Sequence, residues 1–144
     1  MAIYSIGVRT TNLTITQACL ELRTPGTAVP KLLEMSIVQA AATAQSLGLG
    51  RPQAIGITPG GTAILQSEDP PASVPASTVT SALSWATSPT VPLIFHRRWN
   101  SAAVIGVGVV WVFPRGLGIP ISFSLVVWNI TAAQASDCCV VMDE

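Results

Sequence analysis

Charged residues are scarce in this chain. Only 10% of its 144 residues are Asp, Glu, Lys or Arg, against about 25% in an ordinary soluble protein. Seven basic and seven acidic residues give a formal net charge of zero. Proteins that bind nucleic acid or anionic lipid by electrostatic attraction carry an excess of positive charge. We therefore expect neither nucleic acid nor a membrane surface as a partner.

The scarcity of charge also bears on the surface. With so few charged side chains, apolar groups must cover part of it, and large exposed apolar patches usually mark interaction sites. Lys31 is the only lysine, so the other basic residues are arginines, which protein interfaces favour over lysine. We expect part of this surface to be buried against another subunit.

Residues suited to catalysis or metal binding are few. His96 is the only histidine, and the chain lacks the G-x-S-x-G turn that presents a catalytic serine. The chain has three cysteines, Cys19, Cys138 and Cys139. An odd number, with two of them adjacent in the sequence, does not suit a disulfide framework. Together with His96 they make a poor zinc site. We predict no enzyme activity, no catalytic residue, no metal site and no cofactor, and we expect buried thiols in a protein made in a reducing cytoplasm.

Long hydrophobic runs and export signals are also absent. The longest apolar run is about a dozen residues, shorter than the roughly 20 that a membrane-spanning helix needs. The first residues lack the basic and long apolar regions of a signal peptide. These patterns favour synthesis in the cytoplasm without export.

Two apolar segments, Ala102–Phe113 and Ile119–Ile130, dominate the second half of the chain. Both are rich in Val, Ile, Phe and Trp, which favour strands, and residues 114–118 between them contain one Pro and two Gly. This pattern predicts a long β-hairpin. The first segment is apolar on both faces. We expect its Trp111 face to fill a core, and its other face, with Gly106 and Gly108, to contact a second sheet or a second subunit.

The remaining chain alternates between short strand patterns and Pro- or Gly-rich breaks. A helix is the alternative for Val29–Ala42, whereas residues 46–52 and 68–75 are expected to be loops. The fold class is therefore all-β, a single domain over residues 1–144 with about 8–10 antiparallel strands in a jelly-roll-like β-sandwich or barrel. The other expected strands are Ala2–Arg9, Ala18–Arg23, Val29–Ala42, Ala54–Thr58, Thr62–Gln66, Thr78–Thr87, Leu93–Trp99 and Asp137–Asp143.

One polar cluster stands out in a stretch without acidic residues. It comprises residues 96–99, and no Asp or Glu occurs between Pro70 and Ser136. Arg97 and Arg98 point to opposite faces of a strand, so at least one needs an acidic partner. That partner is Glu34 or Glu21 of this chain, a neighbouring subunit, or a bound anion. The candidate interface residues are Arg97, Arg98, Trp99, Arg115, Gly106 and Gly108.

Several segments of the sequence resemble a known family. They are the opening I-Y-S-I-G-V-R-T-T-N, the middle L-G-L-G-R-P-Q-A-I-G-I-T-P, the later P-T-V-P with F-H-R-R, and W-V-F-P-R-G-L-G-I-P followed by S-L-V-V-W-N and V-V-M-D-E. Together they are similar to small structural proteins of tailed bacteriophages that decorate or cement the capsid. The resemblance implies a virion protein with a jelly-roll-like fold, located on the capsid surface and made in the host cytoplasm. It also implies contact with the major capsid protein and self-association as a homo-oligomer, for which a trimer is the first guess.

Three functions remain in competition at this point. The first is a non-enzymatic structural protein that stabilises a shell, with capsid decoration as its specific form. The second is a ligand-binding β-module, such as a lectin-like or receptor-binding virion head. The third, an enzyme, has no supporting motif.

Overall fold

The protein is built from β-strands, as the sequence predicts. The computed structural model describes residues 2–11, 17–58, 63–68, 75–131 and 134–144. Within these ranges no residue is helical, and eleven strands form two antiparallel sheets. The strands are β1 (Ile3–Arg9), β2 (Ala18–Arg23), β3 (Lys31–Gln39), β4 (Ser46–Gly50), β5 (Ala63–Ile64), β6 (Gln66–Ser67), β7 (Thr80–Ala82), β8 (Arg97–Asn100), β9 (Gly108–Gly118), β10 (Ser124–Asn129) and β11 (Ser136–Asp143).

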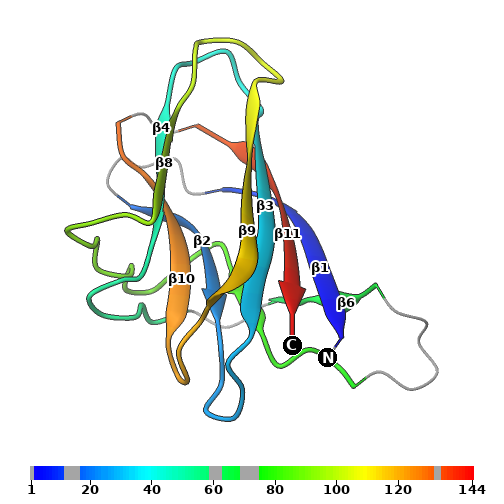
Figure 1. The fold of residues 1–144 in the computed structure, drawn as a ribbon. Helices are drawn as coiled ribbons and strands as arrows, with labels where there is room; N and C mark the ends of the chain where they lie inside the picture. The colour runs from blue at the N-terminus through cyan, green and yellow to red at the C-terminus, as the bar shows by residue number, and fades with distance from the viewer. Residues whose placement is uncertain (1, 12–16, 59–62, 69–74, 132–133) are drawn as a thin grey trace.

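The two sheets pack face to face, which confirms the predicted β-sandwich (Figure 1). The five-stranded sheet has the order β6-β1-β11-β3-β9, and the six-stranded sheet has the order β5-β7-β2-β10-β4-β8. Jelly-roll connectivity stays a prediction. Alternate side chains of both sheets meet in one apolar core, which includes Leu20, Leu22, Leu32, Met35, Ile37, Leu125, Val127, Val140 and Met142.

The sandwich has two lateral sides, where the chain passes between the sheets. On one side β5 and β6 follow each other directly and pair with different sheets. On the other side β8 and β9 are the edge strands of the two sheets. The guanidinium carbon of Arg97 in β8 lies 5.1 Å from the centre of the Phe113 ring in β9. We call these the β5/β6 side and the β8/β9 side.

Strand β10 is buried on both of its faces. Leu125 and Val127 point into the core between the sheets. Val126 and Trp128 point outward into a second apolar cluster with Ala18. Trp85 and Phe95, from the chain between β7 and β8, cover this cluster. A central strand packed between two layers accounts for a segment with so few polar side chains.

The predicted long hairpin is wrong. β9 pairs with β3 in the five-stranded sheet, whereas β10 pairs with β2 and β4 in the other sheet. The expected turn at 114–118 is the irregular end of β9, where the pairing jumps from Leu32–Leu117 to Glu34–Val112. The chain crosses between the sheets after β9, and this places β10, which is apolar on both faces, where a layer covers each of its faces.

One face of β9 lies where the sequence predicts and the other does not. Trp111 and Phe113 are buried in the core, as predicted. The opposite face does not meet a second sheet: Val110 and Val112 are 56% and 54% exposed in the single chain. Residues 102–107, expected to belong to this strand, precede it.

Strand predictions elsewhere were confirmed where the alternation is regular. The segments at Ile3–Arg9, Ala18–Arg23, Lys31–Gln39 and Ser136–Asp143 are strands, so the helical alternative for the third is wrong. Ala54–Thr58 forms only a single bridge, between Ile57 and Thr87. Two other expected strands shorten to β7 and β8, and residues 59–62 and 69–74 lie outside the described residues.

The expected loop at 46–52 contains strand β4. The loop was predicted from its glycines, which the structure needs for close packing. A Cβ atom at Gly48 would lie 2.6 Å from Cδ1 of Phe95 and 2.9 Å from Cδ1 of Ile130. The glycine is there because an outer layer packs directly on the backbone of the strand. Composition alone gives such a segment the appearance of a loop.

Gly48→Ala tests this close packing. Because the added methyl group would overlap the Phe95 ring, we expect a loss of about 1–3 kcal/mol in the free energy of unfolding. Urea denaturation measures it. The matched control is Gly7→Ala, also in a strand, where a Cβ atom would meet nothing within 4 Å. Equal stability of the two variants would contradict the proposed packing.

Candidate functional site

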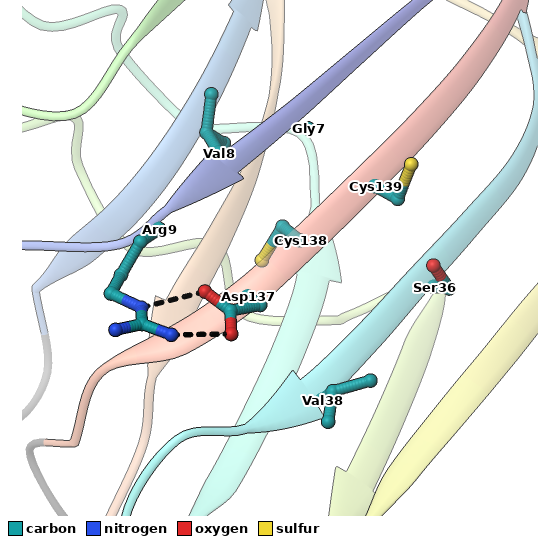
Figure 2. A pocket seen from close by; sticks show the side chains of 8 residues that line it. All are labelled: Gly7, Val8, Arg9, Ser36, Val38, Asp137, Cys138 and Cys139. Atoms are coloured by element: carbon teal, nitrogen blue, oxygen red, sulfur yellow. Dashed lines mark hydrogen bonds and ion pairs between the residues drawn. The ribbon is translucent and has the colours of Figure 1, made fainter. Parts of the chain in front are cut away.

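A shallow hollow lies on the outer face of the five-stranded sheet (Figure 2). It has a volume of about 350 Å³ and crosses β1, β11 and β3. The strand pairing places Gly7, Cys139 and Ser36 in one row across the sheet. The hollow exists because these side chains are small.

One ion pair closes an end of this hollow. Arg9 donates from Nε and Nη2 to the two carboxylate oxygens of Asp137, both at 2.7 Å. The hydrogen bond from Arg9 lowers the pKa of Asp137 below its ordinary value. Because both groups are solvent-exposed and satisfy each other, they are a cross-strand pair on the sheet surface.

The adjacent cysteines have opposite environments. Cys138 points into the core, and burial raises its pKa to about 12. Cys19 is buried in the same core, and its pKa is also raised by burial. Cys139 is exposed in the hollow, so the expectation of buried thiols is wrong for this residue. The alternation of a strand puts neighbours on opposite faces.

The β8/β9 side gathers several of the arginines predicted at an interface. Arg97 and Arg115 line a second open hollow of about 360 Å³, together with Phe113, Pro114 and Gly116. Arg98 lies over the Phe95 ring, at 5.7 Å from its centre. The two neighbouring arginines thus contact opposite faces of the sheet, as predicted.

Arg51 adds a further positive charge to this side. Its Nη2 donates to the carbonyl oxygen of Gly118, at the end of β9, at 2.8 Å. Both Arg51 and Arg97 lower the pKa of His96, after partial burial as the larger cause. We call Arg51, Arg97, Arg98 and Arg115 the basic side.

The intramolecular acidic partners expected for Arg97 and Arg98 pair elsewhere or not at all. Glu21 is fully buried and accepts hydrogen bonds from Arg23 at 2.9 Å and from Trp85 Nε1 at 2.6 Å. The chain around Trp85 covers it. Among the described residues, the ion pairs are Arg9–Asp137 and Arg23–Glu21. Glu34 takes part in neither.

The other predicted interface residues lie apart from the basic side's hollow. Trp99 is half-buried and packs against the main core. Gly106 has a positive φ of 82° in the loop before β9. A Cβ atom at Gly108 would lie 2.7 Å from the Ile37 carbonyl oxygen. The close approach at Gly108 is therefore made by β3 of the same chain.

Strongly exposed apolar side chains were missed by the sequence analysis. Leu93 and Ile94, expected in a strand, are 89% and 84% exposed. The Pro residues at 89 and 92 were the signal that the strand begins later. A second segment, residues 53–57, carries the exposed Ile55 and Ile57. It is hydrogen-bonded to residues 87–90, which directly precede the segment that contains Leu93 and Ile94. We call residues 53–57 and 91–94 the apolar loops.

The described residues contain no group of three His, Cys, Asp or Glu side chains placed to hold a metal ion. In the same ranges, no helix has the length and apolarity required to cross a bilayer. No protein-family model, curated protein or solved structure matches the chain. The surfaces described above are therefore the basis for a functional proposal.

Thiol labelling tests the assignment of the exposed cysteine. In the native protein near neutral pH, we expect a maleimide to modify Cys139 and to spare Cys19 and Cys138, because burial disfavours their thiolates. Intact-mass spectrometry counts the labels, and Cys139→Ser should abolish native labelling. Modification of all the thiols without denaturant would contradict the described core.

A proton titration tests the positive field of the basic side. We expect the His96 imidazole to titrate below its ordinary pKa of 6.5, and the midpoint to rise towards that value in Arg97→Gln. NMR of the ring protons measures both. Because the unfolded chain binds this proton first, acidification through about pH 6.5 should lower stability, and His96→Gln should remove that part of the pH dependence. A midpoint above the ordinary value in the wild type would contradict the assignment.

Proposed function

We propose that this protein is a non-enzymatic virion structural protein that binds the outer surface of a capsid and stabilises the shell. Its partners in this proposal are the major capsid protein and further copies of itself. Its location is the capsid surface, after synthesis in the host cytoplasm. The trimer implied by the family resemblance belongs to the same proposal.

The observation that carries the proposal is the exposure of the apolar loops. Leu93 and Ile94 present almost their whole side chains to solvent, in a chain with only 10% charged residues. Adjacent aliphatic side chains at such exposure are the kind of patch that marks a protein interaction site. Fully burying one such side chain contributes about 1.5–3 kcal/mol.

The chain on either side of Leu93 and Ile94 is held in place. The neighbouring Phe95 ring packs edge-on against Trp128, with 5.8 Å between the ring centres. His96 N–H donates to the Leu49 carbonyl oxygen at 2.8 Å, and Thr90 N–H donates to the Ala54 carbonyl oxygen at 3.0 Å. A segment whose flanking backbone is already fixed loses less conformational entropy on binding than a free loop does, which favours its use as an anchor.

The glycine-bearing face of β9 does not carry the proposal. The sequence pattern favours this face for contact with a second subunit, and it is open to solvent in the single chain. Its valines are about half exposed, less than the leucine and isoleucine of the apolar loops. The apolar loops therefore replace it as the proposed docking surface.

The alternative of a sugar-binding module has less support. Sugars stack on open aromatic faces, whereas Trp111 is buried in the core, as the sequence predicts, and Trp128 is buried under Trp85 and Phe95 on the outer side of β10. Trp85 and Trp99 are half-buried, and Trp85 donates its indole N–H to Glu21. The exposed surface favours aliphatic contact with another protein.

Removal of the apolar anchor should weaken shell binding. We expect Leu93→Ser combined with Ile94→Ser to reduce the affinity for assembled capsid shells by roughly 100-fold, because two aliphatic contacts are lost. Co-sedimentation with shells of the virus that encodes the chain measures this. The folded state should be unaffected, since neither side chain contributes to the core.

The matched control is Val104→Ser combined with Ile105→Ser. These neighbours are 53% and 65% exposed and lie beyond the other end of β8. We expect their loss to leave shell binding unchanged. If the wild-type protein ignores shells, the proposed function is wrong. If both double variants bind shells like the wild type, the apolar loops are not the docking surface.

A further inference from the structure

Among the described charges that form no ion pair, four arginines lie on one lateral side of the sandwich and Glu68 lies on the other, whereas Lys31, Glu34 and Asp143 lie on the strands between. The basic side occupies the β8/β9 side, and its members form none of the ion pairs found among the described residues. Because the formal net charge is zero, the composition does not reveal this separation of positive and negative charge. Opposite charge on opposite sides of one molecule favours contact between copies.

Glu68 lies on the β5/β6 side, and Glu144 follows the central strand β11, on the other side of β1 from Glu68. Glu68 directly follows β6, and its backbone N–H donates to the Ile3 carbonyl oxygen at 2.9 Å. Glu144 exchanges backbone hydrogen bonds with Ala2, the neighbour of Ile3, at 2.9 and 3.0 Å. Its carboxylate accepts from Ser77 Oγ at 2.9 Å and from Thr78 N–H at 3.1 Å. No described ion pair neutralises either residue, and we call them the acidic side.

We propose that copies of this chain associate head to tail, with the basic side of one copy against the acidic side of the next. Each copy then uses two different surfaces, which is a heterologous contact. Such contacts close into a ring where the rotation between neighbours permits. The inference rests on the proposed function for its biological setting, but the contact can be tested apart from it.

Apolar surface accompanies the charges on both sides. The exposed Pro114 lines the hollow with Arg97 and Arg115, and the buried Phe113 ring lies beneath the Arg97 guanidinium. On the acidic side, Ile64 in β5 is 51% exposed. Arginine beside aromatic and aliphatic groups is the composition that protein interfaces favour. The hollow is therefore suited to receive a carboxylate together with an aliphatic side chain.

Addition of a strand is not the mode of contact that these edges favour. Pro114 and the irregular pairing interrupt β9, and β8 has only four residues. On the other side β5 and β6 have two residues each. Short, interrupted edges offer few free backbone groups to another chain. The contact is therefore expected between side chains, with strong dependence on salt.

A charge-swap experiment tests this contact. One variant combines Arg97→Glu with Arg115→Glu, and the other combines Glu68→Arg with Glu144→Arg. Analytical ultracentrifugation at low salt, about 0.05 M, measures association of the full chain. We expect the wild type to associate, each variant alone to associate at least about tenfold more weakly, and an equimolar mixture to recover association.

Two controls accompany the swap. Glu34→Arg makes the same charge change as Glu68→Arg on the outer face of the five-stranded sheet, and it should associate like the wild type. Because Glu144 also holds Ser77 and Thr78, the single variants Arg115→Glu and Glu68→Arg repeat the test at exposed positions. Thermal melting shows which variants are folded.

The outcomes separate the inference from the proposed function. A wild type that stays monomeric at low salt, charge variants that associate normally, or a mixture that does not recover would each overturn the head-to-tail contact. The charge variants retain the apolar loops, so they should still sediment with capsid shells. Shell binding without self-association would overturn this inference alone, and self-association without shell binding would overturn the proposed function alone.

Discussion

Trp128 is fully buried on the side of β10 that faces away from the sandwich core. Its large side chain requires a cover on the outer face of the six-stranded sheet, and the chain between β7 and β8 supplies that cover with Trp85 and Phe95. The remaining features of this half of the molecule depend on the same contact. Gly48 is needed beneath Phe95, and Glu21 is enclosed beneath Trp85.

The same cover determines what the surface presents. Once Phe95 is fixed on Trp128, the residues before it project away from the sheet, and the residues after it form the edge strand β8. The exposed Leu93 and Ile94 and the arginines at 97 and 98 are therefore placed by one aromatic contact. Docking surface and basic side are adjacent for this reason, and their positions relative to each other are set by the fold.

The sequence predicted the parts of this structure that depend on local alternation. The alternation of apolar and mixed faces predicted strands β1, β2, β3 and β11. The two-layer architecture followed from the number of short strands and the Pro- and Gly-rich breaks between them. The separation of β9 and β10 could not be predicted in the same way. Two neighbouring apolar strands joined by Pro and Gly are compatible with a hairpin or with a crossing between sheets, and only long-range packing decides between them.

The candidate surfaces were predicted in part. Arg97, Arg98 and Arg115 were singled out because no acidic residue is near them in sequence, and the structure brings Arg97 and Arg115 to one hollow. Arg51 was missed because its place beside Gly118 depends on the meeting of two sheets. Burial of Glu21 was missed because a carboxylate on an alternating strand is ordinarily solvated, and nothing local indicates that a tryptophan will cover it.

Strands β1 and β11, which are more than 120 residues apart in the sequence, are neighbours in the five-stranded sheet, and β11 also joins β1 to β3 (Figure 1). Without β11, the strands made earlier have no continuous sheet to form. The five-stranded layer therefore completes only after residues 136–143 have been synthesised. Pairing across such a sequence distance is slow compared with local hairpin closure, so the nascent chain exposes the apolar strands of this layer until β11 has been made, and contact with a partner or a chaperone matters most in that interval.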